Sequence, residues 1–266
     1  MTEIHVYDSI RQKVALLSKT LRFNKFTNRL GRKLALSIED SISLALFKQK
    51  QNIETKKSVY EIFRPACSYK TLVVSMNRWM KLALAALALL LRINRTDQHL
   101  IKHTDSTDIP VCRKKNAKHH RTMKDYAAWG HNGQGHYYGL KLHLTSDLSQ
   151  HVLAVRFTSA NADDRKICIP LNRDLMGIFV ADSGYVSAEL EKNFYIEGQR
   201  LILIKPKKNM RKLATAFDSW VYSTRMLIEI NFRNLKLFYG LLTSLPRSVA
   251  GYLANYTYSL LAYLIA

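Results

Sequence analysis

The spacing of apolar residues along the sequence changes near residue 100, and this change limits the folds that the chain can adopt. Before it, apolar residues recur every three or four positions, as in Val14, Leu17 and Leu21, which is the period of an amphipathic helix. After it, short runs rich in Val, Ile, Leu and Tyr are separated by clusters of Gly, Asn and Asp, a pattern typical of strands joined by turns. The sequence therefore predicts a helical region followed by an α/β region.

The region after residue 100 carries signals for five strands and three helices. Strands are expected at residues 100–106, 137–145, 152–158, 177–181 and 200–205. Helices are expected near residues 166–173 and 187–196, and over residues 219–239. Because three strands come first and the later ones alternate with helices, we expect an α/β fold with a mixed five-stranded sheet flanked by helices. The predicted domains are a small all-α N-terminal region, residues 1–95, and an α/β domain, residues 96–266.

The charge of the chain narrows the class of partner. Lys and Arg total 41 and Asp and Glu total 20, which gives a formal net charge of +21. This excess favours nucleic acid, because neutralised phosphates release counterions. The basic residues lie in runs at 11–33, 113–124 and 205–212, whereas a lipid-binding segment concentrates them in one amphipathic stretch. Residues 1–95 are expected to bind nucleic acid, for example through a helix-turn-helix, or to serve dimerisation.

Cysteine usage and the chain ends indicate a cytoplasmic protein. Cys67, Cys112 and Cys168 are odd in number and far apart, which argues against a disulfide framework or a CxxC metal site. The first residues lack the basic start and apolar run of a signal peptide. The uncharged stretch 248–266 raises a membrane-associated alternative, but its polar residues and four tyrosines favour a packed helix. We expect no membrane partner.

Three carboxylates stand where the predicted sheet could gather them. Asp105 lies on the first strand, Asp182 directly follows the fourth strand, and Glu229 lies within the last helix. Side chains alternate along the first strand, so Asp105 shares a face with His103 while Asp108 lies on the other. Convergent carboxylates suit Mg²⁺, and two such ions can assist both oxygens in phosphoryl transfer. Taken alone, Asp105 and Asp182 also fit local strand-end and turn roles.

Four polar residues of the last predicted helix share one face. Tyr222, Arg225, Glu229 and Lys236 follow one another at spacings of three, four and seven residues. As a charge pattern alone, this fits an exposed face with an ordinary salt bridge between Arg225 and Glu229. The same residue types at the same spacings resemble the signature of DDE transposases from bacterial insertion sequences.

Neighbouring segments resemble further motifs of that family in the expected order. Residues 105–107, Asp-Ser-Thr, are similar to its first acidic motif, and residues 182–185, Asp-Ser-Gly-Tyr, to its second. Residues 138–143 are similar to the strand between them. The resemblance covers residues 100–266 and implies a ribonuclease H-like catalytic domain, with an active form that is a homo-oligomer on double-stranded DNA.

The resemblance also implies roles for individual residues. Asp105, Asp182 and Glu229 would be the catalytic and metal-binding residues, holding two Mg²⁺ ions for which Mn²⁺ can substitute. The implied DNA contacts near the cut are Tyr222, Arg225 and Lys236. Physical sense supports these contacts, because cations one and two helical turns from Glu229 could grip phosphates beside the scissile bond.

The segment 112–143 is rich in basic and histidine side chains. Lys118, Arg121 and Lys141 are candidate DNA-binding residues, with a flexible glycine-containing loop around Trp129. A solvated basic loop is an equal alternative. A zinc site is a remoter one, and its candidate ligands are His119, His120, His131 and His136.

The sequence thus predicts a bacterial, nucleoid-associated transposase. It would cleave DNA strands at insertion-sequence ends and transfer them to target DNA. One alternative is a ribonuclease H-like nuclease that does not join strands. Another is a catalytically inactive, DNA-binding transposon remnant.

Overall fold

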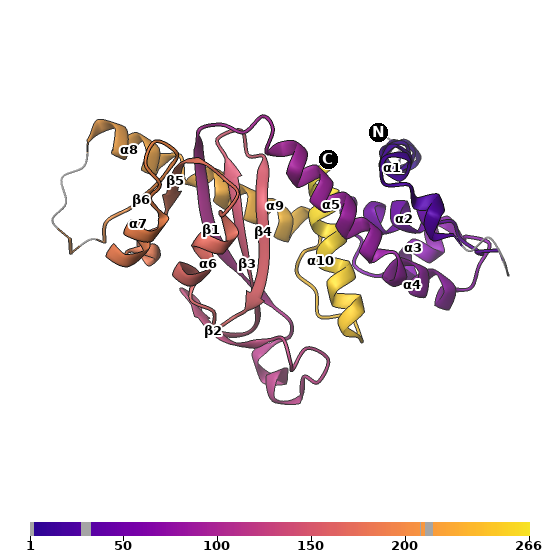
Figure 1. Ribbon diagram of the computed structural model, residues 1–266. Helices are drawn as coiled ribbons and strands as arrows, with labels where there is room; N and C mark the ends of the chain where they lie inside the picture. Colours follow the sequence, from indigo (N-terminus) through magenta and orange to yellow (C-terminus); the bar gives the residue numbers. More distant parts are fainter. Residues whose placement is uncertain (1–2, 28–32, 208, 211–214) are drawn as a thin grey trace. The chain divides into compact units, whose positions relative to one another are not determined.

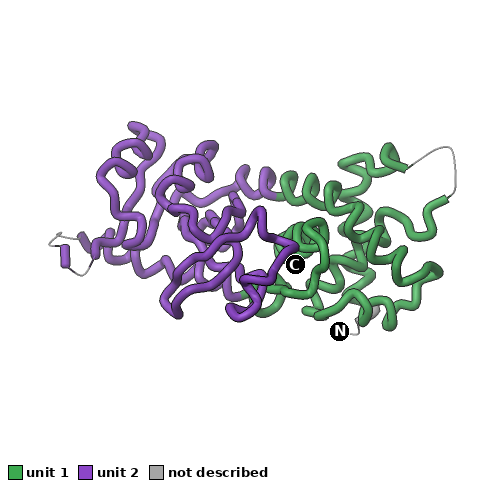
Figure 2. The backbone as a smooth tube through the Cα atoms, turned by 90° about the horizontal axis from the view of Figure 1, so that it is seen from below, with its two compact units in different colours: residues 1–90, 234–266 green, residues 91–233 purple. Residues whose placement is uncertain are grey.

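The structure of the chain is a computed structural model that describes residues 3–27, 33–207, 209–210 and 215–266 (Figure 1). Parts of the predicted basic runs 11–33 and 205–212 lie outside the described residues. The chain falls into two compact units (Figure 2). One, here called the helical unit, contains residues 1–90 and 234–266, and the other, here called the sheet unit, contains residues 91–233.

The helical unit is built from the helices that the N-terminal periodicity predicts, together with the end of the chain. Its helices are α1 (Glu3–Leu21), η1 (Phe23–Phe26), α2 (Ile38–Lys50), α3 (Lys56–Phe63), α4 (Tyr69–Arg78) and α10 (Val249–Leu264). The division between the units falls within α5 (Met80–Asn94) and α9 (Met226–Phe238). Hydroxyl caps mark several helix starts, because each accepts a backbone N–H that the helix leaves unpaired. These caps are Ser37, Thr55, Ser68 and Ser248.

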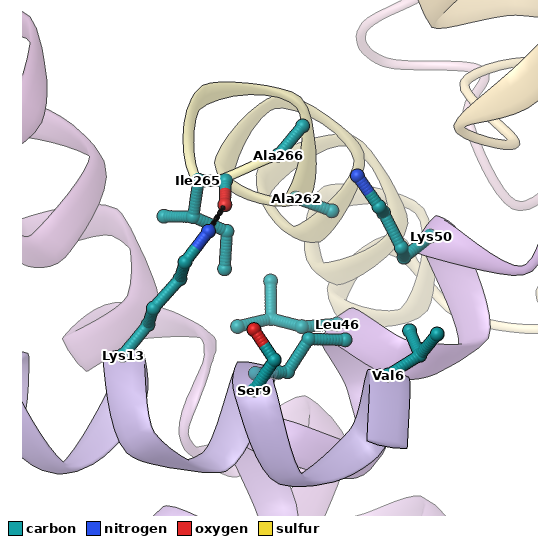
Figure 3. A pocket seen from close by; sticks show the side chains of 9 residues that line it. Val6, Ser9, Lys13, Leu46, Lys50, Ala262, Ile265 and Ala266 are labelled. Atoms are coloured by element: carbon teal, nitrogen blue, oxygen red, sulfur yellow. Dashed lines mark hydrogen bonds between the residues drawn. The ribbon is translucent and has the colours of Figure 1, made fainter. Parts of the chain in front are cut away.

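The C-terminal stretch is a packed helix, as its polar residues predicted. The Tyr258 hydroxyl donates to the carbonyl of Met76 on α4 at 2.9 Å, and the Gln49 amide on α2 donates to Asn255 Oδ1 at 2.8 Å. Where α10 meets α1 and α2, a small pocket of about 280 Å³ is lined by Leu46 and Ala262, among others (Figure 3). Among the described residues no single helix is long and apolar enough to cross a membrane. The bent pair of helices α4 and α5, taken together, reaches the required length and apolar composition.

The compact units therefore differ from the predicted domains at the C-terminal end. The prediction kept residues 96–266 together, whereas residues 234–266 pack with residues 1–90. The physical reason is the tyrosine-rich surface of α10, which is buried against helices α2 and α4. Sequence order alone gave no signal for this return of the chain.

The sheet unit holds a mixed sheet, and all five predicted strands are present in it. Its strands are β1 (Ile101–Pro110), β2 (Ala128–Asn132), β3 (Gly135–Asp147), β4 (Val152–Ser159), β5 (Gly177–Ala181) and β6 (Arg200–Ile204). β3 lies between β1 on one side and both β2 and β4 on the other, and β5 and β6 continue the sheet beyond β1. β1, β5 and β6 are parallel, and β3 is antiparallel to its neighbours.

Strand β2 was not predicted, because its segment was interpreted as part of a flexible loop. Residues 128–139 instead form a hairpin in which His131 faces His136. The segment contains no Val, Ile or Leu, whereas each of the other strands contains at least two of these residues. Gly130 fits there because a Cβ would lie 2.8 Å from Ala160 Cβ and 2.9 Å from the Tyr137 ring.

Helices cover both faces of the sheet, as the α/β prediction requires. Phe179 and Ala181 pack with α6 (Asp164–Leu171), η3 (Ser183–Tyr185) and α7 (Ala188–Phe194), whereas Val180 packs with Val221 of α8 (Ala216–Ser223). This alternation along β5 follows from the period of two in a strand. The sheet is therefore buried on both faces beside the ends of β1 and β5.

Candidate active site

Two of the three acids come together because β1 and β5 are parallel neighbours. The register pairs Lys102 with Phe179 and His103 with Val180. Continuing it by two residues sets Asp105 alongside Asp182, where β5 has just ended. Each carboxylate accepts a hydrogen bond from the next backbone N–H, since Asp105 Oδ1 accepts that of Ser106 at 2.8 Å and Asp182 Oδ1 that of Ser183 at 2.6 Å.

The third acid is placed by a break in the predicted helix 219–239. The structure has two helices there, α8 and α9, which meet at Thr224 and Arg225. Two hydroxyls compete with the helix at this point: Ser223 Oγ donates to the carbonyl of Trp220 at 2.6 Å and Thr224 Oγ1 to that of Val221 at 2.7 Å. The prediction of one continuous helix is therefore wrong. Glu229 consequently lies in the first turn of α9, where a negative charge is favoured.

The three acids converge on the guanidinium of Arg225. Its Nη2 lies 3.1 Å from Asp105 Oδ2, 3.2 Å from Glu229 Oε1 and 3.6 Å from Asp182 Oδ2. The predicted salt bridge between Arg225 and Glu229 is present, but it is one of three. One cation thus holds together carboxylates from three separate parts of the chain.

The electrostatics of this cluster favour an opposing cation. Burial raises the pKa of Asp105 to about 6, although the Arg225 charge and the Ser106 N–H oppose the rise. Burial tends to lower the pKa of Arg225, but the facing acids, Asp105 foremost, leave it raised overall. Asp105 is the least exposed of the three, with 15% of its side chain accessible against 59% for Glu229. The ion pair with Arg225 therefore offsets the cost of burying the Asp105 charge.

A buried histidine supports the joint from which Arg225 extends. His103 lies on the same face of β1 as Asp105, and its Nε2 is 2.8 Å from Thr224 Oγ1. Burial lowers the pKa of His103 to about 4, with Arg225 adding to the effect and Asp147 opposing it. A neutral imidazole thus links β1 to the α8–α9 joint. The alternation of side chains along the strand predicts the face on which His103 lies, but no sequence signal indicates a role for it or for Thr224, since their contact joins residues 121 positions apart.

The other predicted site residues are placed differently. The break in the helix puts Tyr222 on α8, so the predicted common face of four polar residues is not formed. The Tyr222 hydroxyl donates to the carbonyl of Ile204 at the end of β6, at 3.0 Å. Lys236 lies on α9, seven residues after Glu229, in the part of the chain assigned to the helical unit.

The predicted basic contacts fall into two kinds. Lys141 on β3 donates to Asp164 Oδ1 at 2.9 Å and to the carbonyl of Ala162 at 3.1 Å, so its ammonium is engaged within the sheet unit. Lys118, in η2 (Lys114–His119), and Arg121 are exposed. Their segment is fixed by buried neighbours and presents its basic side chains to solvent. This placement is compatible with phosphate contacts.

The acids fit a divalent metal in the chemistry of their donors. Hard cations such as Mg²⁺ prefer carboxylate oxygens at about 2.0 to 2.1 Å. Here a guanidinium nitrogen occupies the position that all three carboxylates face, at longer distances. Within the described residues no group of three or more His, Cys, Asp or Glu side chains is close enough together to hold a metal ion. A metal would therefore have to replace Arg225 at the centre of the cluster.

Comparisons with known proteins match most of the sheet unit and part of the helical unit. A family model described as a transposase DDE domain matches residues 95–248. No curated protein sequence matches the chain. Among solved structures, one match is a piggyBac transposase synaptic complex with hairpin DNA, at 8% sequence identity and a TM-score of 0.43. That match covers 79% of this chain and 50% of the other, so the chain spans half the length of that protein.

Proposed function

We propose that this chain, which belongs to the transposase DDE domain family, cuts DNA at the ends of a bacterial insertion sequence and joins the freed ends to target DNA. The observation that carries the proposal is the convergence of Asp105, Asp182 and Glu229 on one cation. All three acids lie within the matched residues 95–248. The strand order, with β3 antiparallel to its neighbours and β1, β5 and β6 parallel to one another, supports a ribonuclease H-like form of the fold.

The same three acids would hold the metal ions. Carboxylates from β1, the end of β5 and the first turn of α9 would bind two Mg²⁺ ions, for which Mn²⁺ can substitute. When bound, the ions supply activation of the attacking oxygen and stabilisation of the leaving oxygen in phosphoryl transfer. The contribution of the chain is to hold Asp105 and Asp182 side by side, while the α8–α9 joint brings Glu229 to them.

The guanidinium of Arg225 would occupy one position before metal binds and another afterwards. Without metal its guanidinium balances the three acids, as the distances of 3.1 to 3.6 Å indicate. A divalent cation would replace it, because two cations in one small site repel each other. The released guanidinium extends from the α8–α9 joint and can then grip a phosphate beside the cut, which its planar donors suit.

DNA would be held by the exposed basic segment and by residues near the site. Lys118 and Arg121 carry the phosphate contacts on this proposal, with Lys236 further along α9. The polar groups of Tyr222 and Lys141 are bonded within the sheet unit. These two residues would therefore support the shape of the DNA-binding surface more than they would contact phosphates. We further propose that the protein works in the bacterial cytoplasm at the nucleoid, as a homo-oligomer on double-stranded DNA.

The test is a cleavage and strand-transfer assay on DNA that carries the ends of the element, with Mg²⁺ or Mn²⁺. We expect Asp105→Asn, Asp182→Asn and Glu229→Gln to bind DNA but to lose cleavage and joining. Asp108→Asn is the matched control, because Asp108 lies on the same strand as Asp105 but on its other face. This variant should retain activity.

The same assay distinguishes the alternatives. Cleavage without joined products would favour a nuclease that does not transfer strands. DNA binding without cleavage by the wild-type chain would favour an inactive remnant. Equal activity in the wild type and the three acid variants would show that the acid cluster is not the catalytic site.

A further inference from the structure

The helical unit contains a second concave site, unrelated to the acid cluster. It is a cavity of about 520 Å³ between the start of α3, one side of α4 and the start of α10. Four basic side chains line it, Lys48, Lys56, Lys57 and Arg247, against one acidic side chain, Glu54. The wall thus carries an excess of positive charge inside a pocket large enough for a small organic ligand.

Lys48 is the unusual residue of this wall, because a lysine is rarely buried without an ion-pair partner. Only 9% of the residue is exposed. Among the described residues its ammonium donates solely to Gln49 Oε1, at 3.3 Å, and it forms no ion pair. The Gln49 amide nitrogen is itself committed to Asn255. A buried cation with one long bond to a neutral amide is under-satisfied.

Lys56 lies on the same wall, is partly buried and also lacks an ion-pair partner among the described residues. Its ammonium donates to Asn77 Oδ1 at 2.6 Å, and within the described chain it has no carboxylate partner. Burial lowers the pKa of both Lys48 and Lys56 to about 8. The Glu54 carboxylate opposes the lowering at Lys48, whereas the charge of Lys48 adds to it at Lys56. Two half-satisfied ammonium groups that repel each other define a place where an anion would be stabilised.

The remaining lining adds to this preference. Helix α10 begins at the cavity, with Ser248 as its cap, and the start of a sixteen-residue helix favours negative charge. Arg247 precedes that cap and is exposed, while Lys57 pairs only loosely with Glu61, at 3.7 Å. Tyr69, Leu245 and Pro246 provide an apolar and aromatic part of the wall. The lining thus combines cations for a phosphate with an apolar surface for a base.

We propose that this cavity binds the phosphate group of a nucleotide-sized ligand, through the ammonium groups of Lys48 and Lys56 and the start of α10. Two sources share this chemistry: a nucleotide of a DNA strand, and a free mononucleotide or phosphate. The inference does not depend on the proposed transposition, because the cavity lies in the other compact unit and its readout is binding.

The test compares a double variant with a charge-matched control. Lys48→Met/Lys56→Met removes the buried charge of Lys48 and the partly buried charge of Lys56 at nearly constant volume, and Lys19→Met/Lys81→Met removes two exposed charges that do not line the cavity. Binding of inorganic phosphate, deoxyadenosine monophosphate and duplex DNA is measured by calorimetry at constant ionic strength. We expect the cavity variant to bind phosphate and the mononucleotide at least about tenfold more weakly than the control does.

Each outcome decides a point. If DNA affinity also falls more in the cavity variant than in the control, the ligand is a nucleotide of DNA; if only the small ligands weaken, it is a free phosphate compound. Equal phosphate binding by the two variants overturns the proposal. If the cavity variant does not fold, reductive methylation of the wild type replaces it. Phosphate should then protect Lys48 and Lys56 but not Lys81, and lack of protection overturns the proposal.

Discussion

At the scale of single residues, Arg225 sets the state of the acid cluster. Its guanidinium fills the place that a metal ion would need. We therefore predict that Arg225→Ala binds Mn²⁺ in the absence of DNA about tenfold or more tightly than the wild type, since a competing charged contact is worth about 1.5 to 3 kcal/mol. Electron paramagnetic resonance of free Mn²⁺ measures this directly. Arg165→Ala, whose partner is Asp163, should leave Mn²⁺ affinity unchanged. Unchanged affinity in Arg225→Ala would refute the competition.

His103 gives the site a dependence on pH. Its pKa falls from 6.5 to about 4 on folding, chiefly through burial. A lowered pKa means that the neutral form stabilises the fold above pH 6.5, and that this stability is lost as the pH falls towards 4. Asp105, whose pKa is raised, acts in the opposite sense between 3.8 and about 6. The difference between wild type and His103→Gln isolates the histidine.

We predict that denaturant unfolding of the wild type loses on the order of 3 kcal/mol more than His103→Gln between pH 7 and pH 4. His119→Gln, an exposed histidine in η2, is the control and should follow the wild type. Parallel pH profiles for His103→Gln and the wild type would show that His103 is not the titrating group.

The acids and their cation illustrate what a sequence can and cannot show about a site. The pair of Arg225 and Glu229 was predictable, because four residues on a helix bring side chains together. The contact between Arg225 and Asp105 joins positions 120 residues apart, and it depends on a joint between helices that the helical pattern concealed. The spacing of residues in the sequence therefore indicated the members of the site. Only the tertiary structure showed that Arg225 lies at its centre.

At the scale of elements, the hairpin of β2 and β3 rests on a glycine. A Cβ at Gly130 would lie 2.8 Å from both Cβ and the carbonyl oxygen of Ala160, whereas nothing lies within 4 Å of one at Gly133 in the turn. Gly130→Ala should therefore lower the free energy of unfolding by about 1 to 3 kcal/mol, as overpacking does. Gly133→Ala should change it by less than about 0.5 kcal/mol. Urea unfolding of both variants measures this, and equal stability would mean that the hairpin does not approach Ala160 closely.

The elements also divide by how far local sequence determines them. Each of the five predicted strands contains at least two Val, Ile or Leu residues, and Ser187 caps α7 as its position predicted. Strand β2 escaped prediction because it is stabilised by pairing with β3 rather than by its own composition. The break between α8 and α9 was not predicted, because Ser and Thr residues also occur within helices. Only the bonds of Ser223 and Thr224 to preceding carbonyls show that a helix ends there. Strand pairing is a tertiary interaction that local propensity does not decide, and a hydroxyl that can bond a carbonyl three residues back does not always do so.

At the scale of the whole molecule, the charge of +21 means that the proposed DNA binding would be driven largely by counterion release. Each phosphate contact contributes about 0.9 to the slope of log affinity against log salt. Replacing the exposed Lys118 and Arg121 by Gln should therefore reduce that slope by about 2, with little change in sequence preference. Fluorescence anisotropy over a salt series measures it. Lys166→Gln/Lys192→Gln removes the same charge from exposed positions on α6 and α7 and should reduce the slope by much less. An equal reduction of the slope in the two double variants would mean that DNA affinity depends on net charge alone. DNA would then follow no fixed path along residues 113–124.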